Sequence, residues 1–364
     1  AYEITYGDWS SDVCSSDLVF SLFAADSPPV DAVFVAPREF LAALAPLVEH
    51  RQKQGHRFAV VSNLGTPENI RASIRQIAKT NTLKFVVIVG DAEPASRTNQ
   101  TVAARCVPTH LEPATVNVKW GSEPQIASDN WYADLDDDHL PDLAIGRIPA
   151  DSPAELSRIV AKILSYERNT DFSDWRQRVN LIAGVGGFNP ILDSVIETAT
   201  NKLLTSGVPA AYDTRMTYGS WRSPYCPDPR LFHAMTIERH NEGCLFWVYI
   251  GHGQATELDK VSIPGERFPI LNVDHCRELK ARGGAPIAIM LACYTAAFDQ
   301  SQDCLAEQLL KADGGPVAVY GGSRVTMPYA MGVMGMAMMD EYFQKQPATL
   351  GETILAAKRR TMQR

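Results

Sequence analysis

A histidine and a cysteine that each follow an apolar run are the residues in this sequence best suited to chemistry. His252 lies between two glycines directly after Leu245–Ile250, and Cys293 follows Ile287–Leu291 with one alanine between them. A thiol needs a nearby base or positive charge to become a good nucleophile, and an imidazole supplies both. Glycines beside the histidine let a backbone amide approach a substrate carbonyl. We therefore predict a nucleophilic site in which a backbone amide beside His252 and the amide of Cys293 form the oxyanion hole.

Each half of this pattern also has an ordinary structural explanation. A cysteine at the end of a buried strand is most often a small apolar packing residue. A histidine between two glycines is harder to explain as a core residue, because glycines neither pack nor fix the backbone. The joint pattern is much rarer than either half, and it favours the chemical interpretation.

Strands that alternate with helices must position the two side chains. The expected strands are residues 30–35, 58–61, 84–89, 143–148, 179–183, 245–250, 287–291 and 316–320. The expected helices are residues 39–54, 66–77, 151–168, 191–206 and 304–311, whereas residues 92–142 are expected to be irregular. This alternation is typical of right-handed crossovers on a parallel sheet. Ligands bind beyond the carboxyl ends of such strands, so two parallel neighbours would bring His252 and Cys293 to one edge.

The same pattern predicts an α/β protein of two three-layer subdomains with mostly parallel sheets. The character of the sequence changes at residues 171–175, and we place the boundary near residue 170. This gives an N-terminal subdomain at residues 28–170 and a catalytic subdomain at residues 171–364. Residues 1–27 are expected to be partly artefactual, because Asp12–Leu18 resembles the translation of a common sequencing-library adapter, and Cys14 is assigned no chemical role.

Composition limits the classes of partner. Among 364 residues, 45% are hydrophobic and 21% are charged, and no apolar run reaches the roughly 18 residues that a membrane-spanning helix needs. The net charge of -8 argues against nucleic acid, because phosphate binding relies on clustered Lys and Arg. The seven cysteines show no CxxC or Cys/His ligand spacing, which disfavours a zinc module. A protein or peptide is the expected partner, and the oligomeric state is not predicted.

Two segments resemble the signatures of the caspase, legumain and gingipain clan of cysteine peptidases. They are Tyr249–Gly253 and Ile289–Cys293, and the gingipain family is the nearest match. The similarity runs over roughly residues 30–364 and includes the stretches Ser128–Asp134, Ile145–Pro149, Cys304–Leu310 and Gly315–Ser323. The resemblance implies that the second subdomain is caspase-like.

The same resemblance implies a cysteine endopeptidase that forms a thioester acyl-enzyme at Cys293, with His252 as general base and acid. It also implies that the amides of Gly253 and Cys293 form the oxyanion hole. It implies an extracellular, cell-surface or periplasmic location and no cofactor for the chemistry. Asp193 roughly matches the pocket aspartate of the Arg-cleaving gingipains, and Ser323 is a second candidate for substrate binding. A carboxylate in that pocket would select a basic residue before the cleaved bond through a charge-assisted pair. At a helix start, an Asp more often supplies only a favourable end charge.

One departure from the family pattern bears on activity. Gingipains place an acidic residue that orients the histidine after the first strand of the catalytic subdomain, and Val185 stands at the matching position. A backbone carbonyl could hold the imidazole instead, or the chain could be a binding or scaffolding module with weak or lost turnover. A transpeptidase is a third hypothesis, because an amine can resolve an acyl-enzyme in place of water. The chain stops at Arg364, where such domains usually continue, so we expect a fragment.

An acidic segment offers a candidate metal site. It places carboxylates at offsets of 0, 2, 4 and 8 residues, at Asp134, Asp136, Asp138 and Asp142. Hard oxygen ligands at alternating positions of a tight loop suit a structural Ca²⁺ ion. The usual glycine after the third Asp is His139, and the closing Glu is absent. The alternative is a solvated acidic turn.

A second group of Cys and His residues is expected to have no chemical role. Cys244 falls at the start of a strand, at the opposite edge from the predicted site, while His275 and Cys276 lie in a polar helix that we expect on the surface. His240 completes this group. The methionine-rich segment Met331–Met339 has helical spacing and is expected to pack in the core.

Overall fold

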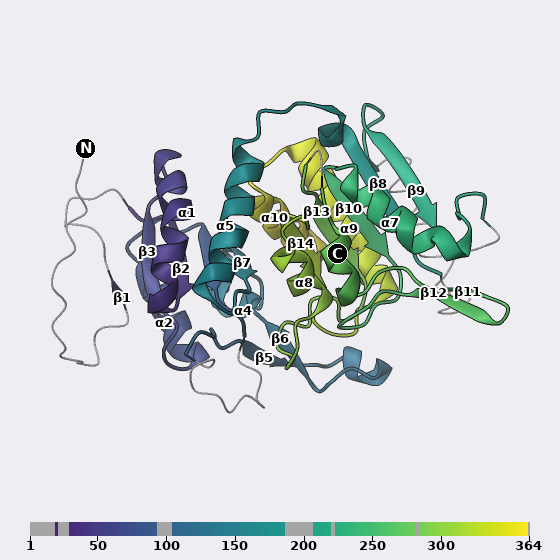
Figure 1. The fold of residues 1–364 in the computed structure, drawn as a ribbon. Helices are drawn as coiled ribbons and strands as arrows, with labels where there is room; N and C mark the ends of the chain where they lie inside the picture. Colours follow the sequence, from purple (N-terminus) through teal and green to yellow (C-terminus); the bar gives the residue numbers. More distant parts are fainter. Residues whose placement is uncertain are drawn as a thin grey trace.

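Two five-stranded sheets, each flanked by helices, make up the computed structural model of this chain (Figure 1). The structure describes residues 19–20, 29–92, 104–185, 207–219, 223–281 and 284–362. Every strand pairing in the two large sheets is parallel except that of the first strand, so the predicted α/β class with mostly parallel sheets is confirmed. Several predicted features lie outside the described residues. They are Asp193, Cys14, the expected helix 191–206, and residues 1–27 apart from residues 19–20.

The N-terminal sheet has the order β1-β3-β2-β4-β7. Its strands are β1 (Val19–Phe20), β3 (Phe58–Ser62), β2 (Ala32–Ala36), β4 (Phe85–Val89) and β7 (Ala144–Ile148). Helices α1 (Leu41–Lys53) and α5 (Pro153–Arg168) cover one face, and helices α2 (Pro67–Ala78) and α4 (Asn130–Ala133) cover the other. Burial on both faces explains why the central strands are almost continuously apolar.

The C-terminal sheet has the order β14-β13-β10-β8-β9. Its strands are β14 (Ala318–Gly321), β13 (Ile287–Leu291), β10 (Phe246–Ile250), β8 (Arg178–Ala183) and β9 (Asp213–Tyr218). Helices α9 (Pro328–Asp340) and α10 (Leu350–Met362) pack on one face, and α7 (Phe232–Asn241) and α8 (Leu305–Lys311) on the other.

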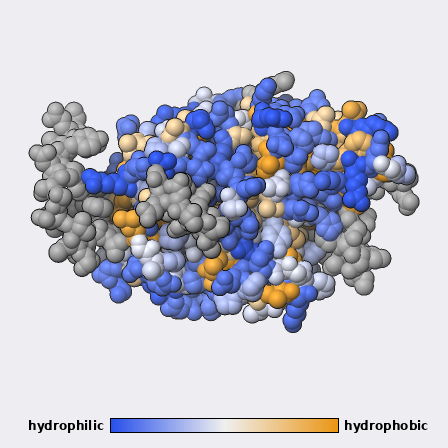
Figure 2. All heavy atoms as spheres, turned by 60° about the horizontal axis from the view of Figure 1, so that its bottom comes forward, coloured by the Kyte–Doolittle hydropathy of each residue, from blue (hydrophilic) through white to orange (hydrophobic). Residues whose placement is uncertain are grey.

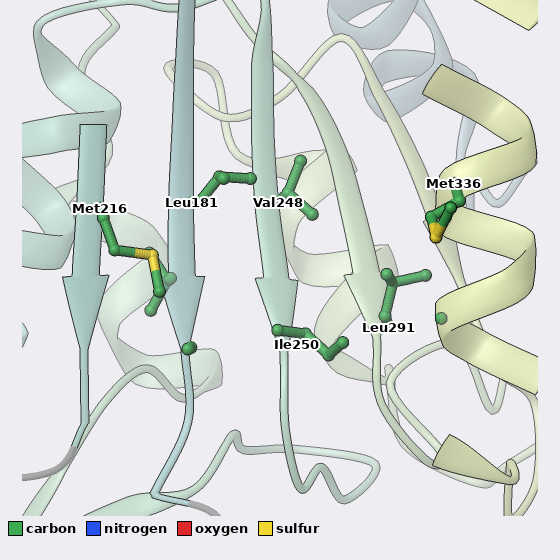
Figure 3. A pocket seen from close by; sticks show the side chains of 10 residues that line it. Leu181, Met216, Val248, Ile250, Leu291 and Met336 are labelled. Carbon is green, nitrogen blue, oxygen red and sulfur yellow. The ribbon is translucent and has the colours of Figure 1, made fainter. Parts of the chain in front are cut away.

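Helix α9 covers the central strands of this sheet with methionine side chains. Figure 3 shows Leu181, Val248 and Leu291 side by side on neighbouring strands, with Met336 of α9 close to Leu291. Met331, Met334, Met338 and Met339 are buried in the same core, so the prediction that this segment packs is confirmed. The recess drawn in Figure 3 is lined by apolar residues and offers no group for chemistry.

The segment 92–142 is more regular than predicted over its described part. Strands β5 (His110–Pro113) and β6 (Gln125–Ser128) form an antiparallel hairpin, and a short helix η2 (Asn117–Trp120) lies between them. We call residues 110–128 the hairpin arm. Its strands have four residues each and are only partly buried, so they leave no apolar run in the sequence. The expectation of an irregular segment was therefore wrong for the hairpin arm and for α4, which follows it in the chain.

A second short hairpin and a short helix were also missed or misplaced. Strands β11 (Lys260–Ile263) and β12 (Glu266–Pro269) pair with each other in a separate two-stranded sheet. Helix η6 (Val273–Glu278) follows them and turns Cys276 into the core, where it is 3% exposed. The expectation of a surface position for Cys276 was wrong. Its side chain packs in the apolar core, although the neighbouring residues of the helix are polar.

The two lobes are joined by more than the chain connection. Helix α10 of the C-terminal lobe packs against β7, the edge strand of the N-terminal sheet (Figure 1). Lys162 of α5 donates to the carbonyls of Leu310 and Ala312 at 2.6 and 2.8 Å. Helix α5 ends at Arg168 and β8 begins at Arg178, and the subdomain boundary near residue 170 stays a prediction. None of the helices in the described ranges is both long and apolar enough to span a membrane.

A buried ion pair fixes the part of the N-terminal lobe that faces the other lobe. Arg147 of β7 donates to both carboxylate oxygens of Asp129 at 2.7 Å, and also to the carbonyls of Gly90 and Val107. Its side chain is 7% exposed, and its guanidinium lies 5.0 Å from the ring centre of Phe298 in the C-terminal lobe. One arginine thus organises three segments of one lobe and contacts the other.

Replacement of Arg147 by Met is expected to lower the free energy of unfolding by about 3–5 kcal/mol, because it leaves the largely buried Asp129 carboxylate without its cationic partner. Urea unfolding followed by circular dichroism measures this change. The control is Arg158→Met, whose side chain is 56% exposed and should cost at most about 0.5 kcal/mol. Equal losses in the two variants would contradict the assigned role of the pair.

Candidate active site

The parallel pairing of β10 with β13 brings the predicted histidine and cysteine to one edge of the sheet. Ile250 lies opposite Leu291 in the sheet. His252 and Cys293 each follow two residues later, so both stand the same number of residues beyond the paired strands. A Cβ atom added to Gly253 would lie 2.8 Å from the carbonyl oxygen of Cys293. The loop that carries His252 therefore packs directly on the loop that carries Cys293, and only glycine permits that approach.

A buried tyrosine supports the histidine loop from below. Tyr249, at 1% exposure, donates its hydroxyl hydrogen to the carbonyl of His252 at 2.7 Å. Burial, followed by the charge of Asp259, raises the pKa of Tyr249 well above its usual value, so the phenol stays a donor. Cβ atoms on Gly184 and Gly251 would lie 2.7 and 2.5 Å from this hydroxyl oxygen. Two glycines thus make room for one phenol, which fixes the backbone of the catalytic loop.

Asp259 extends this network to the end of β8. Its backbone amide donates to the Tyr249 hydroxyl at 3.4 Å, and its carboxylate accepts from the amide of Val185 at 3.2 Å. Val185 occupies the position where the family resemblance predicted an acidic orienter. The Asp259 carboxylate therefore lies next to this position, but Asp259 belongs to the loop after β10. It accepts a hydrogen bond from the backbone amide of Val185.

Thr326 holds the sulfur of Cys293. The amide of Thr326 donates to Sγ at 3.3 Å, and its hydroxyl lies 3.6 Å from the same atom. The thiol in turn lies 3.6 Å from the Thr326 carbonyl, which can accept its hydrogen. These contacts hold the sulfur in one place beyond the end of β13. Sequence spacing gave no signal for this contact, because Thr326 lies 33 positions further along the chain.

Two backbone amides point to a place for a developing oxyanion. Within the described part of the chain, the amides of Gly253 and Cys293 donate to no protein acceptor, whereas the next amide in each loop, of Gln254 and of Tyr294, is bonded. Tyr294 has a φ of 57°, a left-handed conformation that a residue other than glycine seldom adopts. At this turn, directly after Cys293, the chain leaves the direction of β13, so the Cys293 amide lies at the edge of the sheet. The pattern suits oxyanion stabilisation.

The other cysteines outside this site are poorly placed for chemistry. Burial raises the pKa of the Cys244 and Cys276 thiols to about 12, and it raises the pKa of Cys304 further above its usual value. Burial also lowers the pKa of His240 to about 4, which keeps this imidazole neutral at physiological pH. These thiols stay protonated, whereas Cys293 is only partly buried and carries no disulfide.

The hairpin arm of the N-terminal lobe reaches the catalytic loops. Ser323, predicted as a substrate contact, donates its hydroxyl to the carbonyl of Ala127 in β6 at 2.9 Å, and its role in substrate binding stays a prediction. Arg324 donates to the carbonyl of Gln125 at 2.9 Å and forms a two-pronged pair with Asp299 at 2.8 and 2.6 Å. The arm and the catalytic loops therefore share one hydrogen-bond network.

A recess of about 470 Å³ opens between the lobes, and its wall includes Ala292, which precedes Cys293 in the chain. The catalytic lobe contributes Ala292, Thr326 and Met327 to its wall, and the N-terminal lobe contributes Asn117 and Asn130. The recess therefore joins the thiol-holding segment to the hairpin arm.

The acidic loop gathers three of its four predicted ligands. Oxygens of Asp134, Asp136 and Asp138 lie within 4.8 Å of one another, and the loop has φ values of 66° at Asp137 and 68° at His139. The position where calcium loops carry glycine is thus left-handed here as well, although His139 occupies it. Asp142 is directed elsewhere, because its oxygens accept from the amide of Leu135 and from Arg359. The three grouped carboxylates fit a hard cation, while Arg71 at 3.1 Å competes for Asp134.

Comparison with known proteins gives one family and a set of distant relatives. The model of peptidase family C25 matches residues 25–364. The chain is 23% identical over 340 residues to gingipain R2 of Porphyromonas gingivalis (strain ATCC BAA-308 / W83), covering 88% of this chain and 40% of the relative. It is 24% identical over 310 residues to Lys-gingipain W83 of Porphyromonas gingivalis, covering 81% of this chain and 15% of the relative.

A solved structure shares the fold. The crystal structure of the Arg-specific cysteine proteinase gingipain R superimposes with a TM-score of 0.69 at 20% identity, over 93% of this chain and 74% of that one. The predicted caspase-like architecture is confirmed by this match. The chain spans less than half the length of the curated relatives named above.

Replacement of Tyr249 by Phe is expected to loosen the histidine loop. The change removes the hydrogen bond from the Tyr249 hydroxyl to the His252 carbonyl, and the free energy of unfolding should fall by about 1–2 kcal/mol. Because the loop that carries His252 becomes less well positioned, kcat/KM should fall about tenfold. Peptide cleavage and thermal unfolding of the variant measure the two effects. The control is Tyr342→Phe, a tyrosine packed against Phe246 and Phe343 in the core away from the sheet edge. Unchanged cleavage by Tyr249→Phe would contradict the positioning role.

Proposed function

The chain belongs to peptidase family C25, which confirms the predicted relationship to the gingipains, and we propose that it is a cysteine endopeptidase with Cys293 as its nucleophile. The observation that carries this proposal is the equal displacement of His252 and Cys293 beyond the paired residues Ile250 and Leu291. Equal displacement on neighbouring parallel strands lets a base and a thiol act on the same substrate carbonyl.

In the first step, His252 takes the proton of the Cys293 thiol and the thiolate attacks the carbonyl carbon of the scissile peptide bond. The carbonyl oxygen becomes an oxyanion and receives hydrogen bonds from the amides of Gly253 and Cys293. The tetrahedral intermediate collapses, the C–N bond breaks, and the protonated histidine gives its proton to the leaving amine. The product bound to the protein is a thioester on Cys293.

In the second step, His252 takes a proton from water, and the hydroxide attacks the thioester carbon. The C–S bond breaks, the carboxylic acid product is released, and the leaving thiolate takes the proton back from His252, which restores the starting state. The amide and hydroxyl of Thr326 support the leaving thiolate, because both are placed to donate to Sγ. Tyr249 acts through the backbone of His252 and does not touch the reacting atoms.

We propose that the substrate carries a basic residue before the cleaved bond. The support is the likeness to the Arg-specific cysteine proteinase gingipain R and to Lys-gingipain, which are named for Arg and for Lys. Asp193 remains the proposed pocket carboxylate and lies outside the described residues, while Ser323 remains a proposed contact. By the same likeness we propose action outside the cytoplasm, in the periplasm, at the cell surface or beyond.

Substitution of Cys293 by Ala is expected to reduce cleavage of Arg- and Lys-reporter peptides by at least about a thousandfold, because no other described thiol lies at the site. Release of the reporter group, followed by fluorescence, measures the rate. The control is Cys244→Ala, which removes a free cysteine at the opposite edge of the sheet and should leave the rate unchanged. Equal rates for the wild type and Cys293→Ala would end the claim that Cys293 is the nucleophile.

The alternative of a binding or scaffolding module rests on Val185, the position where the gingipain pattern has an acid. The reporter assay separates the two hypotheses, since a scaffold would show the rate of Cys293→Ala in the wild type as well. A transpeptidase would instead transfer the acyl group to an added amine, and mass spectrometry of the products would reveal the new amide bond.

We also propose that the acidic loop binds a structural Ca²⁺ ion through Asp134, Asp136 and Asp138, whose carboxylate oxygens lie together. Binding to the folded state alone should raise its stability by about 2.7 kcal/mol at a hundred times the dissociation constant, and EDTA should reverse the effect. The rise in Tm with added Ca²⁺, compared in wild type and Asp136→Asn, measures this. The same Tm with Ca²⁺ and with EDTA would contradict the proposal.

A further inference from the structure

The hairpin arm exposes an apolar surface next to the catalytic loops. Val116, Val118 and Trp120 of this segment are 53%, 42% and 65% exposed. Large apolar side chains that are exposed together in a short segment are costly in water, and such groups often mark a binding surface. The exposed tryptophan is the residue type most enriched at binding hot spots. We call these three residues the apolar tip of the arm.

The arm is held against the catalytic loops while its apolar tip stays in solvent. Asn117 donates its side-chain amide to the carbonyl of Val325, the residue before the one that holds the Cys293 sulfur. Tyr294, directly after Cys293, donates its hydroxyl to Glu123 of the arm at 2.9 Å. Polar residues of the arm thus bond the segments around Cys293, while the neighbouring apolar residues of the tip stay exposed.

The recess between the lobes connects the arm to the segment that holds the Cys293 sulfur. Asn117, the first residue of η2, lines this recess together with Thr326. Val116 and Val118 flank Asn117 in the chain, so the apolar tip adjoins a residue of the recess wall. The face of the molecule that carries the lower edge of both lobes comes forward in Figure 2, where hydrophobic patches interrupt a mostly hydrophilic surface.

We propose that the apolar tip of the arm is a substrate-binding subsite that takes a large apolar or aromatic side chain of the polypeptide, a few residues from the cleaved bond. This inference rests on the proposed peptidase function, because it names a second determinant of specificity for the same site. The continuity of the arm with the catalytic loops selects a bound polypeptide substrate as the occupant. The N-terminal lobe then contributes to specificity directly.

The test measures binding in the Cys293→Ala background, so that it does not depend on turnover. Fluorescein-labelled short peptides with one central arginine carry either Phe or Ser at each other position in turn, and fluorescence polarisation gives their Kd values. At one position at least, Phe should bind about tenfold or more tightly than Ser. Adding Trp120→Ser should remove that preference, and Val118→Ser should reduce it. Phe172→Ser is the matched control, because Phe172 is an 85% exposed aromatic residue that precedes β8 and thus lies toward the other edge of the sheet.

Several results would overturn the inference. They are the absence of any Phe preference, a preference that persists in both arm variants, or an equal loss of preference in Phe172→Ser. Thermal unfolding of each variant shows whether the arm variants remain folded, and Val118→Ser serves if Trp120→Ser does not. Dimerisation that Trp120→Ser abolishes, seen by sedimentation, would assign the apolar tip to a second copy of the chain instead. Failure of the proposed function is seen separately, as equal reporter cleavage by wild type and Cys293→Ala.

Discussion

The parallel, in-register pairing of β10 with β13 is the constraint on which the site depends. It fixes Ile250 opposite Leu291, and everything that follows each strand inherits that alignment. A shift of one residue would turn every side chain of β10 to the other face of a sheet that is buried on both faces. The helices on the two faces make such a shift costly, so the relative height of His252 and Cys293 is set by core packing.

Packing alone leaves the loops after the strands free to move, and a second layer of polar contacts restrains them. Tyr249 serves both purposes, because its ring belongs to the core while its hydroxyl bonds the backbone of His252. Gly184 and Gly251 leave the space that this hydroxyl needs. On the cysteine side, Thr326 restrains the sulfur in a comparable way. The site is therefore defined by residues that do not themselves react.

The sequence predicted the parts of this protein that depend on local patterns. Apolar runs located β10 and β13, and the residues that follow them pointed to one edge of the sheet. The hairpin arm escaped detection because its strands are short and half exposed, so they have no apolar run. The contacts of Thr326 and Asp259 escaped because they join segments that only the folded chain brings together. Cys276 was misplaced for a related reason, since one buried side chain in a polar helix leaves no periodic signal.

The N-terminal lobe supports the proposed active site directly. Its arm bonds the residue after Cys293 through Glu123, and it bonds the segment before Thr326 through Ala127 and Gln125. Arg147 of the same lobe lies against Phe298, which follows Cys293 in the same loop. Both loops that hold the thiol are thus supported from the other lobe. A catalytic lobe produced alone would keep the paired strands but lose these supports, because the alignment of His252 and Cys293 comes from the sheet and the shape of the cysteine loop comes from the lobe interface.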